Sequence, residues 1–270
     1  MNLSPQHLQE LYQAYCTTHL LWKRADVNNL RQFEIPRDYN LFFLRKLERR
    51  LRLGQLAEQF VYNQLDTCET TNILAENIQI QKDKRTLGEL DTLLVIDNEP
   101  VHLEIVYKFY VYDETLGGTE IERWIGPNRK DSLVEKLTKL KEKQLPLLYS
   151  QDCTLALKQL ELSNHNFEQQ ILFKAQLFVP YQKHVNFKIL NADCVCGFYI
   201  NTTQIELFKS YQFYIPTKLD WFLDPHEAVN WLEYLNFRSA SYTFLDNNQS
   251  PLFWMKSEGG ELLKVFLVWW

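Results

Sequence analysis

The chain has 270 residues, 46% of them hydrophobic and 14% aromatic, which is enough apolar material for a large globular core. Its formal net charge of −5 at pH 7 argues against a protein coated for nucleic acid, so any basic interface must be local. No apolar run approaches the roughly 18 residues that a membrane span needs, and the first residues lack the pattern of a signal peptide. An odd number of scattered cysteines, five, is typical of reduced thiols, and we therefore expect a cytoplasmic protein without membrane contact.

Helices are expected before the first strand. Ser4 and Pro5 form a good helix start, a capping serine followed by proline at the first helical position. A second helical stretch is predicted from about 38 to 51. A third is predicted over 55–65, where the apolar residues form one stripe and Glu58 lies at its edge.

A strand and a hairpin follow. Residues 73–81 alternate between apolar and polar side chains, which predicts a strand. Residues 90–96 are almost wholly apolar, 97–100 read as a turn, and a second apolar run covers 101–111. This pattern predicts a buried β-hairpin.

The next elements are a loop, a helix and a strand. Residues 113–130 are polar and contain glycine, as expected of a loop. Ser132 and Glu135 have the spacing of a capping box, and the amphipathic helix that they open is predicted to stop at Pro146. A further strand is predicted over 171–179. The order helix, strand, hairpin, helix, strand favours an α/β protein with a mixed α+β sheet and helices on its faces.

The last third differs in character and suggests a smaller α+β region. We expect short strands, a helix and a final hairpin at 195–200, 204–208, 211–215, 225–235 and around 258–261. Five of the seven tryptophans lie here, and those at the C-terminus must pack on the chain itself or on a partner. The predicted division is a helical lead-in at 1–50, a core at 51–180 and the C-terminal region at 181–270.

Two acidic residues lie on the predicted hairpin. Asp91 is on its first strand and Glu104 on its second. A carboxylate buried there must be paired, hydrogen-bonded or metal-bound, because desolvating it alone costs several kcal/mol or more. A shared divalent cation is one explanation. Capping a turn or pairing with an arginine are the alternatives.

The pattern around these acids resembles the core of the PD-(D/E)XK nuclease superfamily. It consists of Gly-Glu-Leu-Asp at 88–91, then Glu104 and Lys108 on the following strand. The wider chain resembles one uncharacterised bacterial group, domain of unknown function 1853, in segments at 52–54, 124–128 and 144–147 and in its tryptophan-rich tail. The resemblance implies a restriction-endonuclease-like core flanked by helices. It brings no established substrate.

The resemblance also implies roles for particular residues. Asp91, Glu104 and the backbone carbonyl of Ile105 would hold Mg²⁺ or Mn²⁺, which prefer oxygen ligands. Lys108 would orient the attacking water or neutralise the phosphate. Glu58 matches the first-helix glutamate of many superfamily members, where it would hold a metal-bound water or support a second ion.

The position of the lysine departs from the superfamily pattern. The usual lysine lies two residues after the acid, where this chain has Val106. At about 3.3 Å per residue, Glu104 and Lys108 share a strand face but lie roughly 13 Å apart. A β-bulge could shorten that gap. The sequence leaves open an altered or inactive site, and also a plain salt bridge for Lys108.

Positive charge is concentrated in two segments, 37–52 and 129–143. A nuclease needs a local basic track beside its acidic site, whereas solvated helix faces are the alternative explanation. Gln144 resembles a substrate-contacting glutamine of some superfamily nucleases, although it could equally be a helix-end residue. The residues expected at a nucleic-acid interface are Arg49, Arg50, Arg52, Arg129, Lys130, Lys136 and Gln144.

The function that we expect is metal-dependent hydrolysis of phosphodiester bonds in nucleic acid, DNA by preference. Two alternatives come from other classes of protein. One is a nucleic-acid-binding module of the same fold with weak or no catalysis. The other is an interaction subunit, or a homo-oligomer, that docks through the tryptophan-rich C-terminal region.

Overall fold

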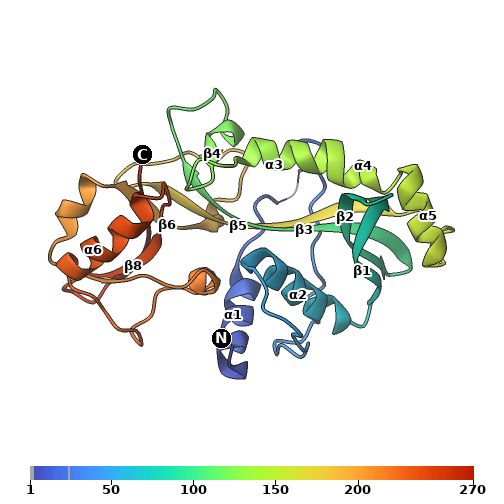
Figure 1. The fold of residues 1–270 in the computed structure, drawn as a ribbon, viewed down its shortest axis with the longest axis horizontal. Helices are drawn as coiled ribbons and strands as arrows, with labels where there is room; N and C mark the ends of the chain where they lie inside the picture. Colours follow the sequence, from blue (N-terminus) through green and yellow to red (C-terminus); the bar gives the residue numbers. More distant parts are fainter. Residues whose placement is uncertain (1–2, 24) are drawn as a thin grey trace. The chain divides into compact units, whose positions relative to one another are not determined.

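A computed structural model describes residues 3–23 and 25–270 of the chain. The chain forms two compact units. Unit 1 comprises Met1–Gln13, Leu20–Tyr107 and Glu135–Lys174. Unit 2 comprises Ala14–His19, Lys108–Val134 and Ala175–Trp270. Neither unit is continuous in sequence, because two long strands, β3 (Glu99–Tyr112) and β5 (Glu168–Pro180), contribute residues to both (Figure 1). The three regions predicted from the sequence are a different division and stay a prediction.

Two of the predicted N-terminal helices are confirmed. Helix α1 (Pro5–Thr17) begins at the expected cap, where Ser4 Oγ accepts a hydrogen bond from the His7 backbone N–H at 3.2 Å. Helix α2 (Leu53–Asp66) buries the predicted apolar stripe. Glu58 lies at the edge of that stripe and is half-buried.

The helix predicted over 38–51 is wrong, because this segment is extended and irregular. The buried amide of Asn63 on α2 occupies backbone groups that a helix would use. Its Oδ1 accepts from the N–H groups of Leu44 and Arg45 at 2.7 and 3.2 Å, and its Nδ2 donates to Phe42 O at 3.0 Å. Competition of this kind between a distant side chain and a helix has no local signal in the sequence.

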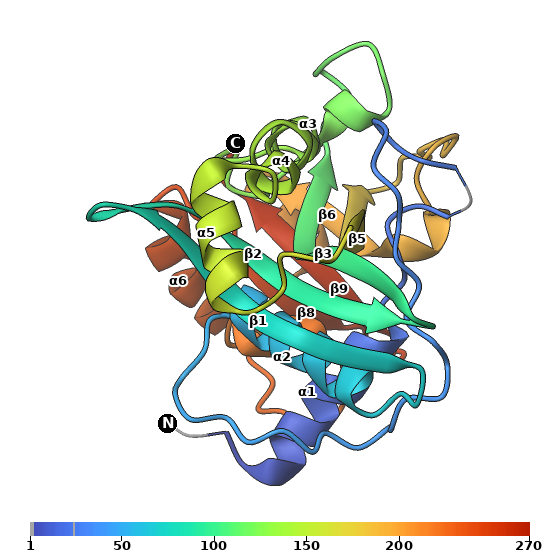
Figure 2. The ribbon, with the colours of Figure 1, turned by 90° about the vertical axis from the view of Figure 1, so that its right-hand side faces the viewer.

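The predicted strand and hairpin of unit 1 are confirmed. Strand β1 (Thr71–Lys82) pairs antiparallel with β2 (Arg85–Ile96), and β2 pairs antiparallel with β3. Strand β5 is the next neighbour of β3 in the sheet. Within unit 1, α2 lies on one face of these strands, and helices α4 (Leu145–Leu147) and α5 (Gln151–Gln159) lie on the other (Figure 2).

The helix predicted to stop at Pro146 ends one residue later, at Leu147. The helical path runs from α3 (Leu133–Lys139) through a π turn (Leu140–Gln144) into α4, which contains the proline. Proline has no N–H, and in a regular α-helix its ring clashes with the carbonyl four residues earlier. We attribute the wider turn before Pro146 to this conflict. Helix α5, which buries Cys153 and little else, has too weak an apolar stripe to be predicted.

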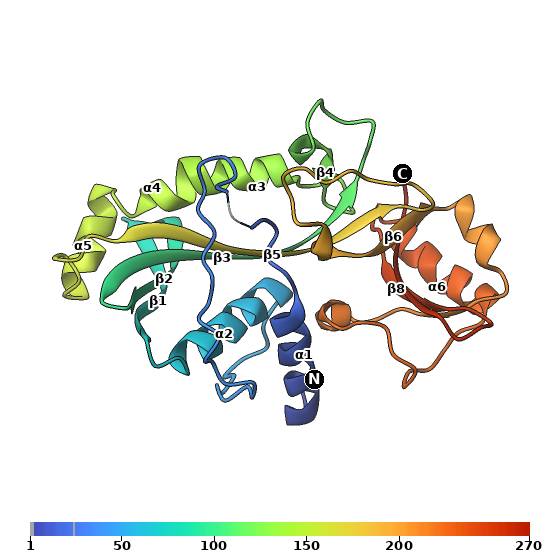
Figure 3. The same cartoon turned by 180° about the vertical axis from the view of Figure 1, so that it is seen from behind.

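In unit 2 the sheet is mixed. Strand β6 (Val195–Asn201) lies parallel to both β5 and β9 (Leu262–Val268). Strand β8 (Leu252–Lys256) pairs antiparallel with β9 and with β7 (Gln212–Tyr214), while β4 (Trp124–Ile125) pairs with β3. These bounds confirm the strands predicted near 195–200 and 211–215 and the final hairpin (Figure 3).

Two C-terminal predictions are wrong. The strand expected at 204–208 is a 3₁₀ helix, and its buried residues Ile205 and Phe208 are three positions apart, the period of that helix. The helix expected near 225–235 is α6 (Tyr234–Leu245) instead. It cannot begin earlier, because Leu232 is held in an extended bridge by two backbone hydrogen bonds with Phe213, of 2.7 and 2.9 Å.

The C-terminal tryptophans pack within unit 2. Trp254 is buried, and the half-buried Trp270 donates from its indole Nε1 to Pro127 O at 3.0 Å. The Arg129 guanidinium lies 4.2 Å from the centre of the Trp270 ring, a cation–π contact. Of the two possibilities for these residues, the structure provides packing on the chain itself.

Among the described residues, no helix is both long enough and apolar enough to cross a membrane.

We expect Asn63→Ala to lower the free energy of unfolding by about 2 kcal/mol, because it leaves three part-buried backbone groups of the 42–45 segment unpaired. Asn63→Asp should lose at least as much, because it buries a carboxylate and turns an oxygen toward the carbonyl of Phe42, to which Asn63 Nδ2 donates. Urea unfolding followed by circular dichroism measures both, with the exposed Asn164→Ala as control. A change below about 0.5 kcal/mol for Asn63→Ala would show that the amide does not hold this segment.

Candidate functional site

The two hairpin acids lie where strands β2 and β3 separate. The paired register of these strands runs as far as Thr92 opposite Leu103, and Asp91 and Glu104 are the next residues on each strand. From this point on, hydrogen bonds from side chains take the place of backbone hydrogen bonds between the two strands. Asp91 Oδ2 accepts from the Ile105 N–H at 2.8 Å, and the Asp91 backbone amide donates to the Glu104 carboxylate. Each acid is therefore held by the backbone of the opposite strand.

Helix α2 supports this fork from one side. Tyr62 on α2 is buried, and its hydroxyl donates to the backbone oxygen of Asp91 at 2.8 Å. The bond ties β2 to α2 at the position where the ladder with β3 ends. In β1, Asn77 has a φ of 51°, an uncommon value for a residue other than glycine, and its Oδ1 lies 3.4 Å from the same hydroxyl.

Glu104 is fully buried and receives a hydrogen bond on each oxygen. Gln144 Nε2 donates to Oε2 at 2.6 Å, and His102 Nε2 lies 3.2 Å from Oε1. The His102 tautomer follows from its other neighbour. Gln169 Nε2 donates to Leu145 O at 2.6 Å, so this amide presents its nitrogen to His102 Nδ1, 3.0 Å away. His102 Nδ1 therefore accepts, and Nε2 carries the proton that points at Glu104.

The remaining partner is a cation. Lys136 on α3 donates to Gln144 Oε1 at 2.8 Å, which orients the amide nitrogen of Gln144 toward Glu104. All these partners donate toward Glu104, and this polarity favours its anion. Burial acts in the opposite direction and raises the pKa of Glu104 to about 7, against the ammonium of Lys136.

The pKa values of two further carboxyl groups are also raised. Burial, reinforced by the charge of Glu104, raises the pKa of Asp91 to about 7. Burial and then the charges of Asp91, Glu89 and Glu104 raise the pKa of Glu58 to about 8, with Arg49 opposing. Raised carboxyl pKa values at one place mean that the site either keeps protons or needs a cation.

The donor set fits a magnesium-like ion better than zinc. Among the described residues, no three side chains of the His, Cys, Asp and Glu types are placed to hold a metal together. A zinc site needs three or four protein ligands, whereas Mg²⁺ is commonly held by one or two carboxylates and keeps several waters. The predicted ligand set of Asp91, Glu104 and the Ile105 carbonyl, all oxygens, stays a prediction.

Lys108 lies in unit 2. Its ammonium is 2.6 Å from Asp131 Oδ2 in a half-exposed ion pair. The salt bridge was the alternative to a catalytic role in the sequence, and the catalytic role stays a prediction.

The predicted nucleic-acid residues are divided between the two units. In unit 1, Lys136 and Gln144 contact the carboxylate network, and the charge of Arg49 acts on Glu58. In unit 2, Arg129 pairs with the buried Asp113 at 2.6 Å. The remaining three predicted residues are exposed: Arg50, Arg52 and Lys130.

Sequence reasoning missed Gln169, which fixes the tautomer of His102. Nothing in a single sequence distinguishes it from its neighbour Gln170. It also missed the position of Lys136 beside the carboxylates, since a lysine on an amphipathic helix usually faces solvent.

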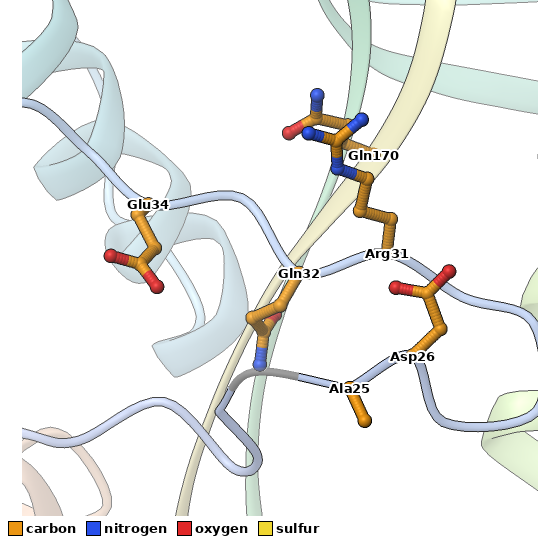
Figure 4. Close-up of a pocket in the computed structure, with 6 residues that line it drawn as sticks. All are labelled: Ala25, Asp26, Arg31, Gln32, Glu34 and Gln170. Atoms are coloured by element: carbon orange, nitrogen blue, oxygen red, sulfur yellow. The ribbon is translucent and has the colours of Figure 1, made fainter.

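A pocket of about 330 Å³ in unit 1 is separate from these acids (Figure 4). Its lining is Ala25, Asp26, Arg31, Gln32, Glu34 and Gln170. Two of these side chains are already engaged: Arg31 pairs with Glu168, and Gln32 accepts from the Phe173 N–H at 2.8 Å. None of the six belongs to the carboxylate network, and the pocket carries no catalytic constellation.

Fold and site together define a mixed α+β protein with a buried carboxylate network at a strand fork. The chain belongs to the family described as Domain of unknown function (DUF1853), whose model matches residues 1–268. Comparisons with curated proteins and with solved structures found no match.

The raised carboxyl pKa values predict how stability depends on pH in the metal-free protein. The ordinary pKa of these groups is about 4, so the folded chain binds more protons than the unfolded chain above that pH. Their contribution is fully present below about pH 4 and is lost as pH rises through about 7 to about 8. We expect the free energy of unfolding in EDTA to fall between pH 5 and pH 8, as measured by urea titration.

Asp91→Asn should flatten that dependence, because it removes one of the titrating groups. The exposed Glu99→Gln serves as the control and should keep the slope of the unmodified protein. A slope that is identical in Asp91→Asn and in the control would contradict the assignment.

Proposed function

We propose that this protein is a metal-dependent nuclease that hydrolyses phosphodiester bonds in nucleic acid, DNA by preference. The observation that carries the proposal is the Asp91–Glu104 pair at the strand fork, where the backbone of each strand donates to the acid of the other and burial raises both carboxyl pKa values to about 7. The order of α2, β1, the β2–β3 hairpin, α3 and β5 supports a PD-(D/E)XK core as the finer description of the fold.

A bound Mg²⁺ or Mn²⁺ would act as a Lewis acid and lower the pKa of a coordinated water. The residues of the chain prepare its place. Asp91, Glu104 and the Ile105 carbonyl would hold the ion, and the donors around Glu104 orient that carboxyl group and favour its anionic form. Glu58 has its pKa raised to about 8 by burial first, so it holds a proton at neutral pH in the metal-free protein.

The basic segment before α2 supports a nucleic-acid ligand. Arg49, Arg50 and Arg52 are exposed, and the charge of Arg49 reaches Glu58. A local positive segment lets a chain of net charge −5 approach a phosphate backbone at the place where its acids are gathered.

A binding module without efficient chemistry is the second candidate, and one observation favours it. The ammonium of Lys108, which the superfamily pattern would use in catalysis, is engaged with Asp131. Docking through the C-terminal region has less support, since Trp270 packs on Pro127 and Arg129 within unit 2. The five cysteines, none of them in a disulfide, support a reducing compartment and so the proposed cytoplasmic location.

Cleavage assays test the nuclease directly. The protein is incubated with single-stranded DNA, duplex DNA and RNA in Mg²⁺ or Mn²⁺. We expect Asp91→Asn and Glu104→Gln each to lose at least about 100-fold in rate, because they remove negative ligands with little change in shape. EDTA should abolish the activity, and Glu99→Gln should keep it. No cleavage by the unmodified protein on any substrate, or equal cleavage by Asp91→Asn, would reject the proposal.

Binding in Ca²⁺ tests the basic segment without turnover. Replacing Arg49, Arg50 and Arg52 together by Gln should weaken binding of a fluorescent DNA strand. For this single strand, the slope of log K against log[salt] should fall by up to about 0.7 for each phosphate that the variant no longer neutralises. The matched control replaces three exposed cations of the β1–β2 turn region, Lys82, Lys84 and Arg85. Equal effects of the two triple variants would show only a loss of general charge.

A further inference from the structure

The ammonium tied to the carboxylate network comes from a helix. Lys136 Nζ donates to Gln144 Oε1 at 2.8 Å, and Gln144 Nε2 donates to Glu104 Oε2 at 2.6 Å. The oxygen of a primary amide can only accept and its nitrogen can only donate. Because the ammonium of Lys136 occupies the amide oxygen of Gln144, the amide nitrogen must point at the buried carboxyl group of Glu104. The charge of Lys136 also acts on Asp91.

The π turn creates this arrangement. Lys136 and Gln144 are eight residues apart, and in a regular α-helix they would differ by about 80° around the axis. The turn over Leu140–Gln144 is wider than an α turn and rotates Gln144 back toward the face of Lys136. Single π turns inside α-helices are uncommon and occur often at functional sites. Here the π turn lets Lys136 contact Gln144, which contacts Glu104.

We propose that Lys136 is the residue that binds the scissile phosphate beside the Asp91–Glu104 pair, and that Gln144 is its positioning residue. The inference rests on the proposed nuclease function for its substrate. It assigns to a helical lysine the part that the sequence pattern expects of Lys108, whose ammonium is 2.6 Å from Asp131 Oδ2.

In this reaction Lys136 acts only through its positive charge and transfers no proton. In the hydrolysis, the water oxygen bonds to phosphorus and the bond from phosphorus to the leaving oxygen breaks. One water proton ends on the leaving oxygen, and the other stays with the new phosphate monoester until that group ionises. Negative charge grows on the phosphate oxygens in the transition state, and a fixed ammonium beside them stabilises it.

An ammonium beside metal-binding carboxylates has a second effect, of opposite sign. It repels a divalent cation that uses the same carboxylates. Replacing Lys136 by Met should therefore tighten Mg²⁺ binding by several-fold while weakening phosphate binding and cleavage. A lysine that only supported the fold would weaken all three when removed.

The experiment uses the full chain and three measurements. Isothermal titration gives the affinity for Mg²⁺ alone and then for inorganic phosphate at saturating Mg²⁺, and a DNA strand gives the cleavage rate. The variants are Lys136→Met, Lys136→Arg, Gln144→Ala and Lys108→Met, with the exposed Lys158→Met as control. Circular dichroism and urea unfolding check that each variant is folded.

We expect Lys136→Met to bind Mg²⁺ more tightly, to bind phosphate at least about 10-fold more weakly and to cleave at least about 100-fold more slowly. Lys136→Arg should keep the weaker Mg²⁺ affinity of the unmodified protein, because the charge remains. Gln144→Ala should lower the rate and weaken phosphate binding, because Lys136 then loses the amide that positions its ammonium. Lys108→Met should lose less cleavage than Lys136→Met, and the control should match the unmodified protein.

Unchanged or weaker Mg²⁺ binding in Lys136→Met would overturn the inference. Unchanged phosphate binding in that variant, or a larger loss of cleavage in Lys108→Met, would overturn it as well. These results leave the nuclease standing if the unmodified protein cleaves. If it cleaves nothing, the proposed function fails, and the Mg²⁺ and phosphate measurements still decide whether Lys136 is the anion-binding group of this site.

Discussion

The structure is organised around the burial of two like charges at one point of a sheet. Asp91 and Glu104 lie where β2 and β3 stop pairing, and each accepts a hydrogen bond from the backbone of the other strand. Burying a carboxylate costs several kcal/mol unless donors surround it. The neighbouring side chains provide those donors, because His102 and Gln144 both point an N–H group at Glu104.

The residues that donate to Glu104 are themselves oriented by further hydrogen bonds. His102 donates in the needed direction because Gln169 presents a nitrogen to its other face, and Gln144 does so because Lys136 occupies its oxygen. A network of this kind has one consistent set of proton positions, which makes the site rigid before any ligand arrives. A hydrated divalent cation is commonly held by one or two carboxylates whose oxygens are already oriented. Pre-organisation, rather than the number of acids, is the property that suits this fork for chemistry.

The parts that could be predicted from the sequence are those whose signal is local. The β2–β3 hairpin and α2 follow from apolar periodicity, and the acids were located on them correctly. The segment 38–51 was predicted wrongly because Asn63, on a different element, binds its backbone. The late start of α6 has a similar cause, since Leu232 pairs with Phe213 about twenty residues away. In both of these cases a tertiary hydrogen bond outweighed a local helical preference.

The sequence by itself determined where negative charge would be buried, because acids inside two adjacent apolar strands have no other place to lie. It did not determine which cation would meet them. Lys108 shares a strand with Glu104 and was the natural candidate, yet its ammonium pairs with Asp131. Lys136 reaches the network through Gln144, and this depends on a π turn before Pro146 and on a helix about forty residues away along the chain. The alternation of side chains along a strand can be read from neighbouring residues in the sequence. Which helix packs against that strand depends on the tertiary packing of the whole chain.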